Sequence, residues 1–118
     1  MAIGARRLVV GAHYGLRDWL IQRATAVVLA IYLIGLAVAL VLARPIEYDS
    51  WAAIFAPLSM KVATLIAFVA LAWHAWVGVR DIWMDYVRPT ALRMFLQLCT
   101  VLWLAACVVW IVQILWRV

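Results

Sequence analysis

The sequence predicts an all-α membrane protein with three transmembrane helices, and its composition and hydropathy pattern both support this. Of its 118 residues, 71% are hydrophobic and the mean hydropathy is +1.11. A soluble domain of this length cannot bury so much apolar surface. The apolar residues fall into long runs, each sufficient to cross a hydrocarbon core of about 30 Å. Eight tryptophans also suit a bilayer, because indole rings collect at its interfaces.

The basic excess indicates membrane topology rather than nucleic-acid binding. Ten Lys and Arg against five Asp and Glu give a formal net charge of +5. These charges lie between the apolar runs. They do not form a surface of basic and aromatic residues on a polar domain, so no nucleic-acid partner is expected. Cys99 and Cys107 lie about 12 Å apart along one predicted helix. That distance is too long for a disulfide, so both are interpreted as small apolar residues.

The first transmembrane helix is predicted over residues 24–43, which carry no charge. The segment before it is basic, with Asp18 as a candidate helix start near the headgroups. A signal peptide has the same order of a basic start and an apolar core. Here the core is longer than a signal peptide requires, so we expect a helix that stays in the membrane.

Two further transmembrane helices are predicted over about residues 62–84 and 94–116. Residues 44–61 contain two prolines and are expected to form a loop with an interfacial segment around residues 51–55. Pro89 cannot lie in a helix interior and therefore marks the turn between the second and third helices. Residues 1–118 are thus predicted to form a single membrane domain.

Arginine and lysine are unequally divided between the two sides of the membrane. Three spans place the N-terminus and the 85–93 link on one side with six basic residues, and three remain on the other side. Cytoplasmic loops carry the excess of Lys and Arg, so the N-terminus is predicted to be cytoplasmic and the C-terminus to lie outside.

The second predicted helix carries polar side chains on one face. His74 lies near the bilayer midplane, and Asp85 follows roughly 16 Å further along the helix axis. Asp81 and Asp85 each fall within about 20° of His74 in projection, whereas Tyr86 points about 120° away. This face therefore joins a buried imidazole to acidic groups near the cytoplasmic surface.

His74 is the sharpest indication of function. An ionisable group at this depth is costly and needs a partner or a role. Neutral imidazole binds metals and haem iron. The alternative is a hydrogen bond between helices, and the candidate partners are Thr64, Gln97 and Thr100. The residues alone leave both interpretations open.

Other residues bear on the choice between an iron ligand and a hydrogen bond between helices for His74. His13 lies in the N-terminal segment, so a haem with two imidazole ligands would take the second from another chain. Gly78, one turn from His74, either leaves room for a flat macrocycle or allows close helix packing.

The remaining polar residues have alternative roles. Asp85 either passes protons or pairs with Arg88 at the surface. Tyr86 either donates a hydrogen bond to a carbonyl oxygen or is an interfacial aromatic. Arg80 has three alternatives. It reaches the lipid headgroups, it pairs with the carboxylate of Asp81 or Asp85, or it contacts another protein chain. Arg23 faces an anionic cofactor group or a lipid phosphate.

Four short stretches share their order and spacing with a known family. They are RATA at residues 23–26, HAWVG at 74–78, DYVRP at 85–89 and ALR at 91–93. In these stretches, in length and in its three-span plan, the chain resembles the hydrophobic membrane anchor of bacterial succinate dehydrogenase. Each stretch is weak alone, but the combination is specific and covers nearly the whole chain.

The resemblance implies a role for each matching residue. His74 corresponds to the axial ligand of haem b, and the other axial histidine comes from a second membrane anchor. Tyr86 corresponds to the tyrosine that hydrogen-bonds a ubiquinone carbonyl, with Asp85 as the adjacent acid. Arg23 corresponds to an arginine near the haem propionates. Arg17 stands where close relatives have a propionate-contacting histidine.

The resemblance also implies the assembly. A flavoprotein, an iron–sulfur protein, the second membrane anchor and this chain would form a complex in the bacterial inner membrane, surrounded by lipid. The chain would then be part of a heteromeric haem-binding helix bundle and would do no succinate chemistry itself. Two other classes stay open: a purely structural small membrane protein, or a small transporter or proton-pathway protein that uses His74, Asp81 and Asp85.

Overall fold

The computed structural model describes the backbone of residues 2–118 and the side chains of residues 15–118. Within these residues the chain forms the helices α1 (Ala2–Leu42), α2 (Tyr48–Phe55), α3 (Leu58–Tyr86) and α4 (Thr90–Leu115). The parts long and apolar enough to cross a membrane are Gly15–Leu42, Leu58–Tyr86 and Thr90–Leu115. The predicted all-α fold with three membrane-spanning helices is confirmed.

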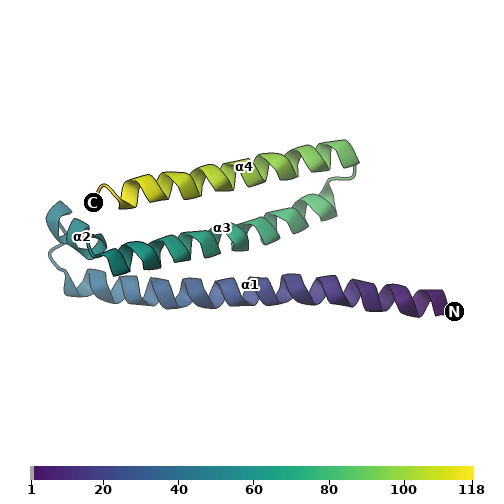
Figure 1. Ribbon diagram of the computed structural model, residues 1–118, viewed down its shortest axis with the longest axis horizontal. Coiled ribbons are helices and arrows are strands. Elements are labelled where there is room, and N and C mark those ends of the chain that lie inside the picture. The colour runs from purple at the N-terminus through teal and green to yellow at the C-terminus, as the bar shows by residue number, and fades with distance from the viewer. Residues whose placement is uncertain (1) are drawn as a thin grey trace.

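The three long helices lie side by side in one layer, with α3 in the middle (Figure 1). Both α1 and α4 pack along α3, whereas no comparable interface joins α1 to α4 in the described part of the chain. One end of the layer holds the link between α3 and α4, and we call it the link end. The opposite end holds α2, and we call it the α2 end (Figure 1).

The buried residues lie mostly along α3. Among the described side chains, the buried ones are Phe55, Thr64, Ala67, Ala70, Val77 and Leu115. Small residues such as Ala67 and Ala70 let a neighbouring helix approach closely, which is how helices associate where lipid offers no hydrophobic driving force. Most large apolar side chains of the described helices face outward. This surface suits lipid and neighbouring membrane proteins rather than water.

The first helix begins earlier than the hydropathy pattern predicts. Asp18 lies inside α1, so its interpretation as a helix start is wrong. Charged residues mark where a chain leaves hydrocarbon, but they do not by themselves stop a helix. Residues 16–23 contain neither Gly nor Pro, so the backbone hydrogen bonds continue through them.

The interfacial segment expected around residues 51–55 is the helix α2. The backbone N–H of Glu47 donates to Ser50 Oγ at 2.9 Å, which satisfies a free donor at the start of this helix. The rings of Trp51 and Phe55 lie 5.1 Å apart. Pro57 and Pro89 directly precede α3 and α4, so the predicted turn at Pro89 is confirmed.

Side-chain hydrogen bonds join the layer at two depths. Tyr32 on α1 and Thr64 on α3 share a bond of 2.7 Å near the α2 end. Trp83 Nε1 on α3 donates to Thr100 Oγ1 on α4 at 3.0 Å nearer the link end. Such bonds between membrane helices contribute about 0.6 kcal/mol on average. They therefore matter more for how the helices align along one another than for the stability of the fold.

We expect Tyr32→Phe to lower the free energy of unfolding of the full chain in mixed micelles by about 0.6 kcal/mol, because it removes this hydroxyl. Tyr48→Phe, at a tyrosine 73% exposed on α2, is the matched control and should change little. A double-mutant cycle with Thr64→Val measures the coupling directly. Independent, additive effects of the two substitutions would contradict the assigned contact.

Candidate functional site

His74 lies half-buried on the side of α3 that faces α1. Its Nδ1 atom is 3.0 Å from Thr25 Oγ1 on α1. The hydrogen bond expected from His74 to Thr64, Gln97 or Thr100 is therefore replaced by one to a residue in the first helix. Thr64 is engaged by Tyr32, and Thr100 by Trp83 and its own helix.

A second contact of the Thr25 hydroxyl determines whether Thr25 or His74 is the donor in the hydrogen bond between them. Thr25 Oγ1 donates to the carbonyl oxygen of Ile21, one turn back on α1, at 2.8 Å. A hydroxyl has one hydrogen to donate but two acceptor lone pairs. Because that hydrogen is used on Ile21, Thr25 accepts a hydrogen bond from His74 Nδ1–H. In the neutral ring the proton then sits on Nδ1, and Nε2 carries the free lone pair.

Gly78 lies one turn along α3 from His74, where Gln22 of α1 approaches. A methyl group added at Gly78 would meet Gln22 Nε2 at 3.9 Å, which is ordinary van der Waals contact. Close packing against α1 therefore does not require glycine at this position, because a methyl group would fit there without a clash. The Gln22 Oε1 atom is buried without a hydrogen-bond partner among the described residues.

Arg80 forms an ion pair with Asp18 between α3 and α1. A second carboxylate, Asp81 Oδ1, lies 4.0 Å from the same guanidinium nitrogen. Of the alternatives considered for Arg80, a pairing with Asp81 is therefore present at this longer distance. Asp18 is the partner that the sequence pattern misses, because the pattern places it at a helix start. The Arg80 Nε atom is buried without a partner in the described part of the chain.

A groove of about 520 Å³ adjoins this ion pair between α1 and α3. Its charged lining consists of Arg17, Asp18, Arg80 and Asp81, and Trp73 and Trp76 supply aromatic surface. Arg17 is therefore on the same side of the helix pair as Arg80. This groove joins both signs of charge to stacking surfaces, so it suits a planar group with a polar edge.

Arg23 lies elsewhere on α1. Its guanidinium carbon is 5.2 Å from the centroid of the Trp19 ring, and its side chain is exposed. In projection, Arg23 is about 160° from Thr25 and Arg17 about 80° from it, at about 100° per residue. The two arginines predicted as propionate contacts thus project from different sides of α1.

Asp85 and Tyr86 occupy the last turn of α3, at the link end. Both are exposed, and Tyr86 is 81% exposed. The surface ion pair considered between Asp85 and Arg88 is not formed; among residues 15–118 neither Asp85 nor Tyr86 has a side-chain partner within bonding distance. Their polar atoms are free to meet a ligand or another protein.

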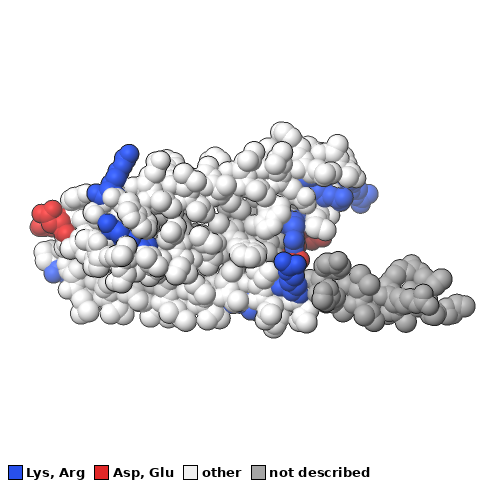
Figure 2. Space-filling view, viewed as in Figure 1, with Lys and Arg blue, Asp and Glu red and all other residues white. Residues whose placement is uncertain are grey.

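On the face that Figure 2 shows, charged residues of the described part gather toward the two ends of the layer, with an uncharged band between them. The described residues contain no group of three or more His, Cys, Asp or Glu that would hold a metal ion. His13 lies outside the described side chains. Among residues 15–118, whose side chains are described, His74 is the one histidine, so this part of the chain can offer iron a single imidazole.

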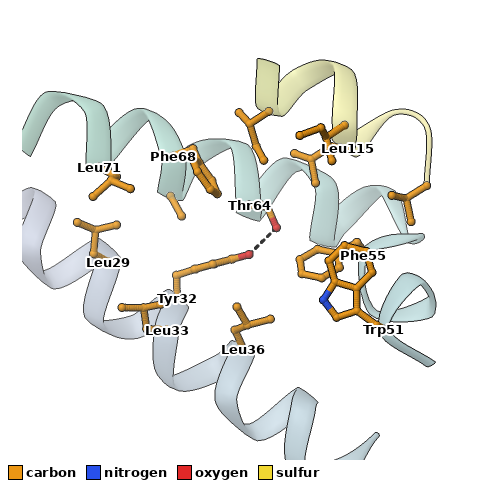
Figure 3. A pocket seen from close by; sticks show the side chains of 14 residues that line it. Leu29, Tyr32, Leu33, Leu36, Trp51, Phe55, Thr64, Phe68, Leu71 and Leu115 are labelled. Carbon is orange, nitrogen blue, oxygen red and sulfur yellow. Dashed lines mark hydrogen bonds between the residues drawn. The ribbon is translucent and has the colours of Figure 1, made fainter. Parts of the chain in front are cut away.

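An apolar cavity of about 420 Å³ lies at the α2 end, between α1, α2, α3 and the last turn of α4 (Figure 3). The Tyr32 and Thr64 hydroxyls point into it but satisfy each other, as the dashed line in Figure 3 marks. Its remaining lining is apolar, including Phe68 and Leu115. It therefore lacks groups for catalysis or metal binding, and none of the residues predicted to be functional lines it.

Comparison with known proteins gives two concordant findings. The family described as succinate dehydrogenase/fumarate reductase transmembrane subunit matches the chain over residues 2–113. The succinate dehydrogenase hydrophobic membrane anchor subunit of Coxiella burnetii (strain RSA 493 / Nine Mile phase I) is 40% identical over 102 residues. That alignment covers 86% of this chain and 89% of the relative.

We expect Arg80→Gln to lower the free energy of unfolding by about 1 kcal/mol, the upper range for a partly exposed ion pair. The Arg80 and Asp18 side chains are 25% and 39% exposed, so water screens part of the attraction. Adding Asp18→Asn to Arg80→Gln should cost little more, because the pair is already broken. A double variant that loses the full sum of the two single effects would contradict the pairing. Unfolding of the full chain in mixed micelles measures all three.

Proposed function

Because the chain belongs to the family of succinate dehydrogenase and fumarate reductase transmembrane subunits, we propose that this membrane anchor helps to bind haem b and ubiquinone. We further propose that it docks an iron–sulfur protein and a flavoprotein at the link end. A second membrane anchor completes both cofactor sites. The proposed setting is a bacterial inner membrane, with the N-terminus and the link end cytoplasmic and the C-terminus periplasmic.

The observation that carries the proposal is the state of the His74 ring. Its Nδ1 lies 3.0 Å from Thr25 Oγ1. Because the Thr25 hydroxyl donates to Ile21, we infer that Nδ1–H is the donor, which leaves Nε2 with the lone pair that an iron ligand needs. Gly78, one turn further along α3, carries no side chain that would block a flat group on this part of the helix. The residues present therefore fit a haem. When bound, haem b would supply one-electron transfer between the soluble partners and the membrane.

Each residue of this chain then has a limited task. His74 would hold the haem iron through Nε2, and a histidine of the second membrane anchor would be the other protein ligand. Arg17, which lines the groove between α1 and α3, would pair with a propionate carboxylate, and its planar guanidinium suits one. Arg23 projects from another side of α1, so its propionate contact would be made toward the partner anchor rather than within the groove.

Tyr86 and Asp85 form this chain's share of the quinone site. Tyr86 would donate a hydrogen bond from its hydroxyl to a ubiquinone carbonyl oxygen, and Asp85 would exchange protons with water at that edge. Both side chains are exposed at the end of α3. The proposed partners at the link end would enclose the quinone against Tyr86, with Asp85 at the edge that stays open to water.

A proton-pathway role has less support. It would require His74, Asp81 and Asp85 to communicate along α3. In the described residues His74 bonds to Thr25, and Asp81 is 4.0 Å from Arg80. Asp85 has no bonded partner there, so no hydrogen-bonded chain links these three groups.

For the haem, we expect His74→Ala to remove the alpha-band absorbance of a b-type cytochrome from the purified complex, because the iron loses an axial ligand. His13→Ala, at the chain's other histidine, is the control and should keep the band. The reduced-minus-oxidised spectrum measures both. An unchanged band in His74→Ala, with every protein of the complex present in full amount, would contradict the ligand assignment.

For the quinone, we expect Tyr86→Phe to weaken ubiquinone binding by about two- to twelve-fold, since it removes one hydrogen bond worth about 0.5–1.5 kcal/mol. Succinate–ubiquinone turnover at varied quinone concentration measures this. Tyr48→Phe, at an exposed tyrosine of the α2 end, should leave the kinetics unchanged. Wild-type quinone affinity and turnover in Tyr86→Phe would remove Tyr86 from the site.

A further inference from the structure

Thr25 is the one side chain of the described residues that contacts the His74 ring by a hydrogen bond. We propose that Thr25 is a positioning residue, which fixes the tautomer and the orientation of His74 and thereby its strength as an iron ligand. This inference rests on the proposed haem site and assigns a task to a residue that the family resemblance left without one.

The geometry commits the hydroxyl to a single arrangement. Thr25 Oγ1 is 2.8 Å from the carbonyl oxygen of Ile21 and 3.2 Å from that of Gln22, so its hydrogen points back along α1. Threonine in a helix commonly makes this bond to the preceding turn. The oxygen lone pairs then face α3, where Nδ1 of His74 lies at 3.0 Å.

The arrangement also couples the ring to the main chain. The hydrogen-bonded series runs from the Ile21 carbonyl through the Thr25 hydroxyl to the His74 ring. Its first member is helix backbone, which cannot rotate away as a surface side chain can. In hydrocarbon no water competes for these groups, so the series holds even though each bond is modest. The ring is thus oriented by α1, although it belongs to α3.

The chemical consequence follows from the donated proton. A histidine ligand that donates its second N–H to an acceptor is a stronger base at its metal-binding nitrogen. Without the Thr25 oxygen, the His74 ring can rotate or exchange its proton between nitrogens. Nε2 then becomes a weaker donor, the oxidised iron is stabilised less, and the haem becomes easier to reduce.

The test compares Thr25→Val with Thr25→Ser in the assembled complex. Valine keeps the branched shape but has no oxygen, whereas serine keeps the hydroxyl. Thr100→Val is the matched control, because Thr100 bonds to Trp83 at the α3–α4 interface and not to the histidine. The readings are the haem midpoint potential by redox titration and the rate of haem loss to apomyoglobin.

We expect Thr25→Val to raise the midpoint potential and to speed haem loss by about ten-fold, the lower end for loss of an outer-shell partner. Thr25→Ser and Thr100→Val should stay near wild type in both readings. If Thr25→Val does not assemble, Thr25→Ala gives the same readings, because it also lacks the acceptor. Wild-type potential and haem loss in the assembled valine or alanine variant would overturn the inference.

The outcomes separate this inference from the proposed function. A complex without haem, or a His74→Ala complex that keeps its haem spectrum, would refute the ligand assignment itself. A His74→Ala complex that loses haem, together with an unchanged Thr25→Val complex, would refute only the role of Thr25.

Discussion

The structure depends on one constraint, that a polar group placed in hydrocarbon must find its partner within the protein. The bond between His74 and Thr25 meets this requirement near the middle of the α1–α3 pair. It also determines the chemistry, because the same bond that satisfies Nδ1 leaves Nε2 free. The contact expected of a purely structural histidine is therefore compatible with the proposed ligand role of the ring. In the proposed function, packing and iron binding would be complementary uses of its two nitrogens, and the first does not argue against the second.

The arrangement of the helices explains why such a chain works with partners. A layer with α3 in the middle leaves both of its faces without a covering helix from the described residues (Figure 1). Few described side chains are buried, and the polar atoms Gln22 Oε1 and Arg80 Nε are buried without partners among them. A second membrane anchor would cover one face of the layer. The pair of exposed residues at the end of α3, Asp85 and Tyr86, would likewise be completed from outside the chain.

Local signals in the sequence predict the elements, but they do not predict how the helices align. Hydropathy predicts the three spans, and proline chemistry predicts the turn at Pro89. Neither predicts that Thr25 meets His74 or that Asp18 meets Arg80. The residues of these pairs are 49 and 62 positions apart in the sequence. Whether they meet depends on the relative axial position of two antiparallel helices. The prediction for Asp18 is wrong because the end of an apolar run resembles the end of a helix. The roles of His74, Tyr86 and Arg17 come from family resemblance, since helix geometry alone leaves their alternatives open.

The central claim is that an imidazole in hydrocarbon serves iron through one nitrogen while the other is held by the protein. A density map of the assembled complex that resolves side chains tests it most directly. The account predicts that His74 Nε2 binds the iron of a porphyrin shared with the second anchor, with Nδ1 still bonded to Thr25. A map in which the His74 ring contacts only side chains, with no porphyrin beside it, would contradict the account.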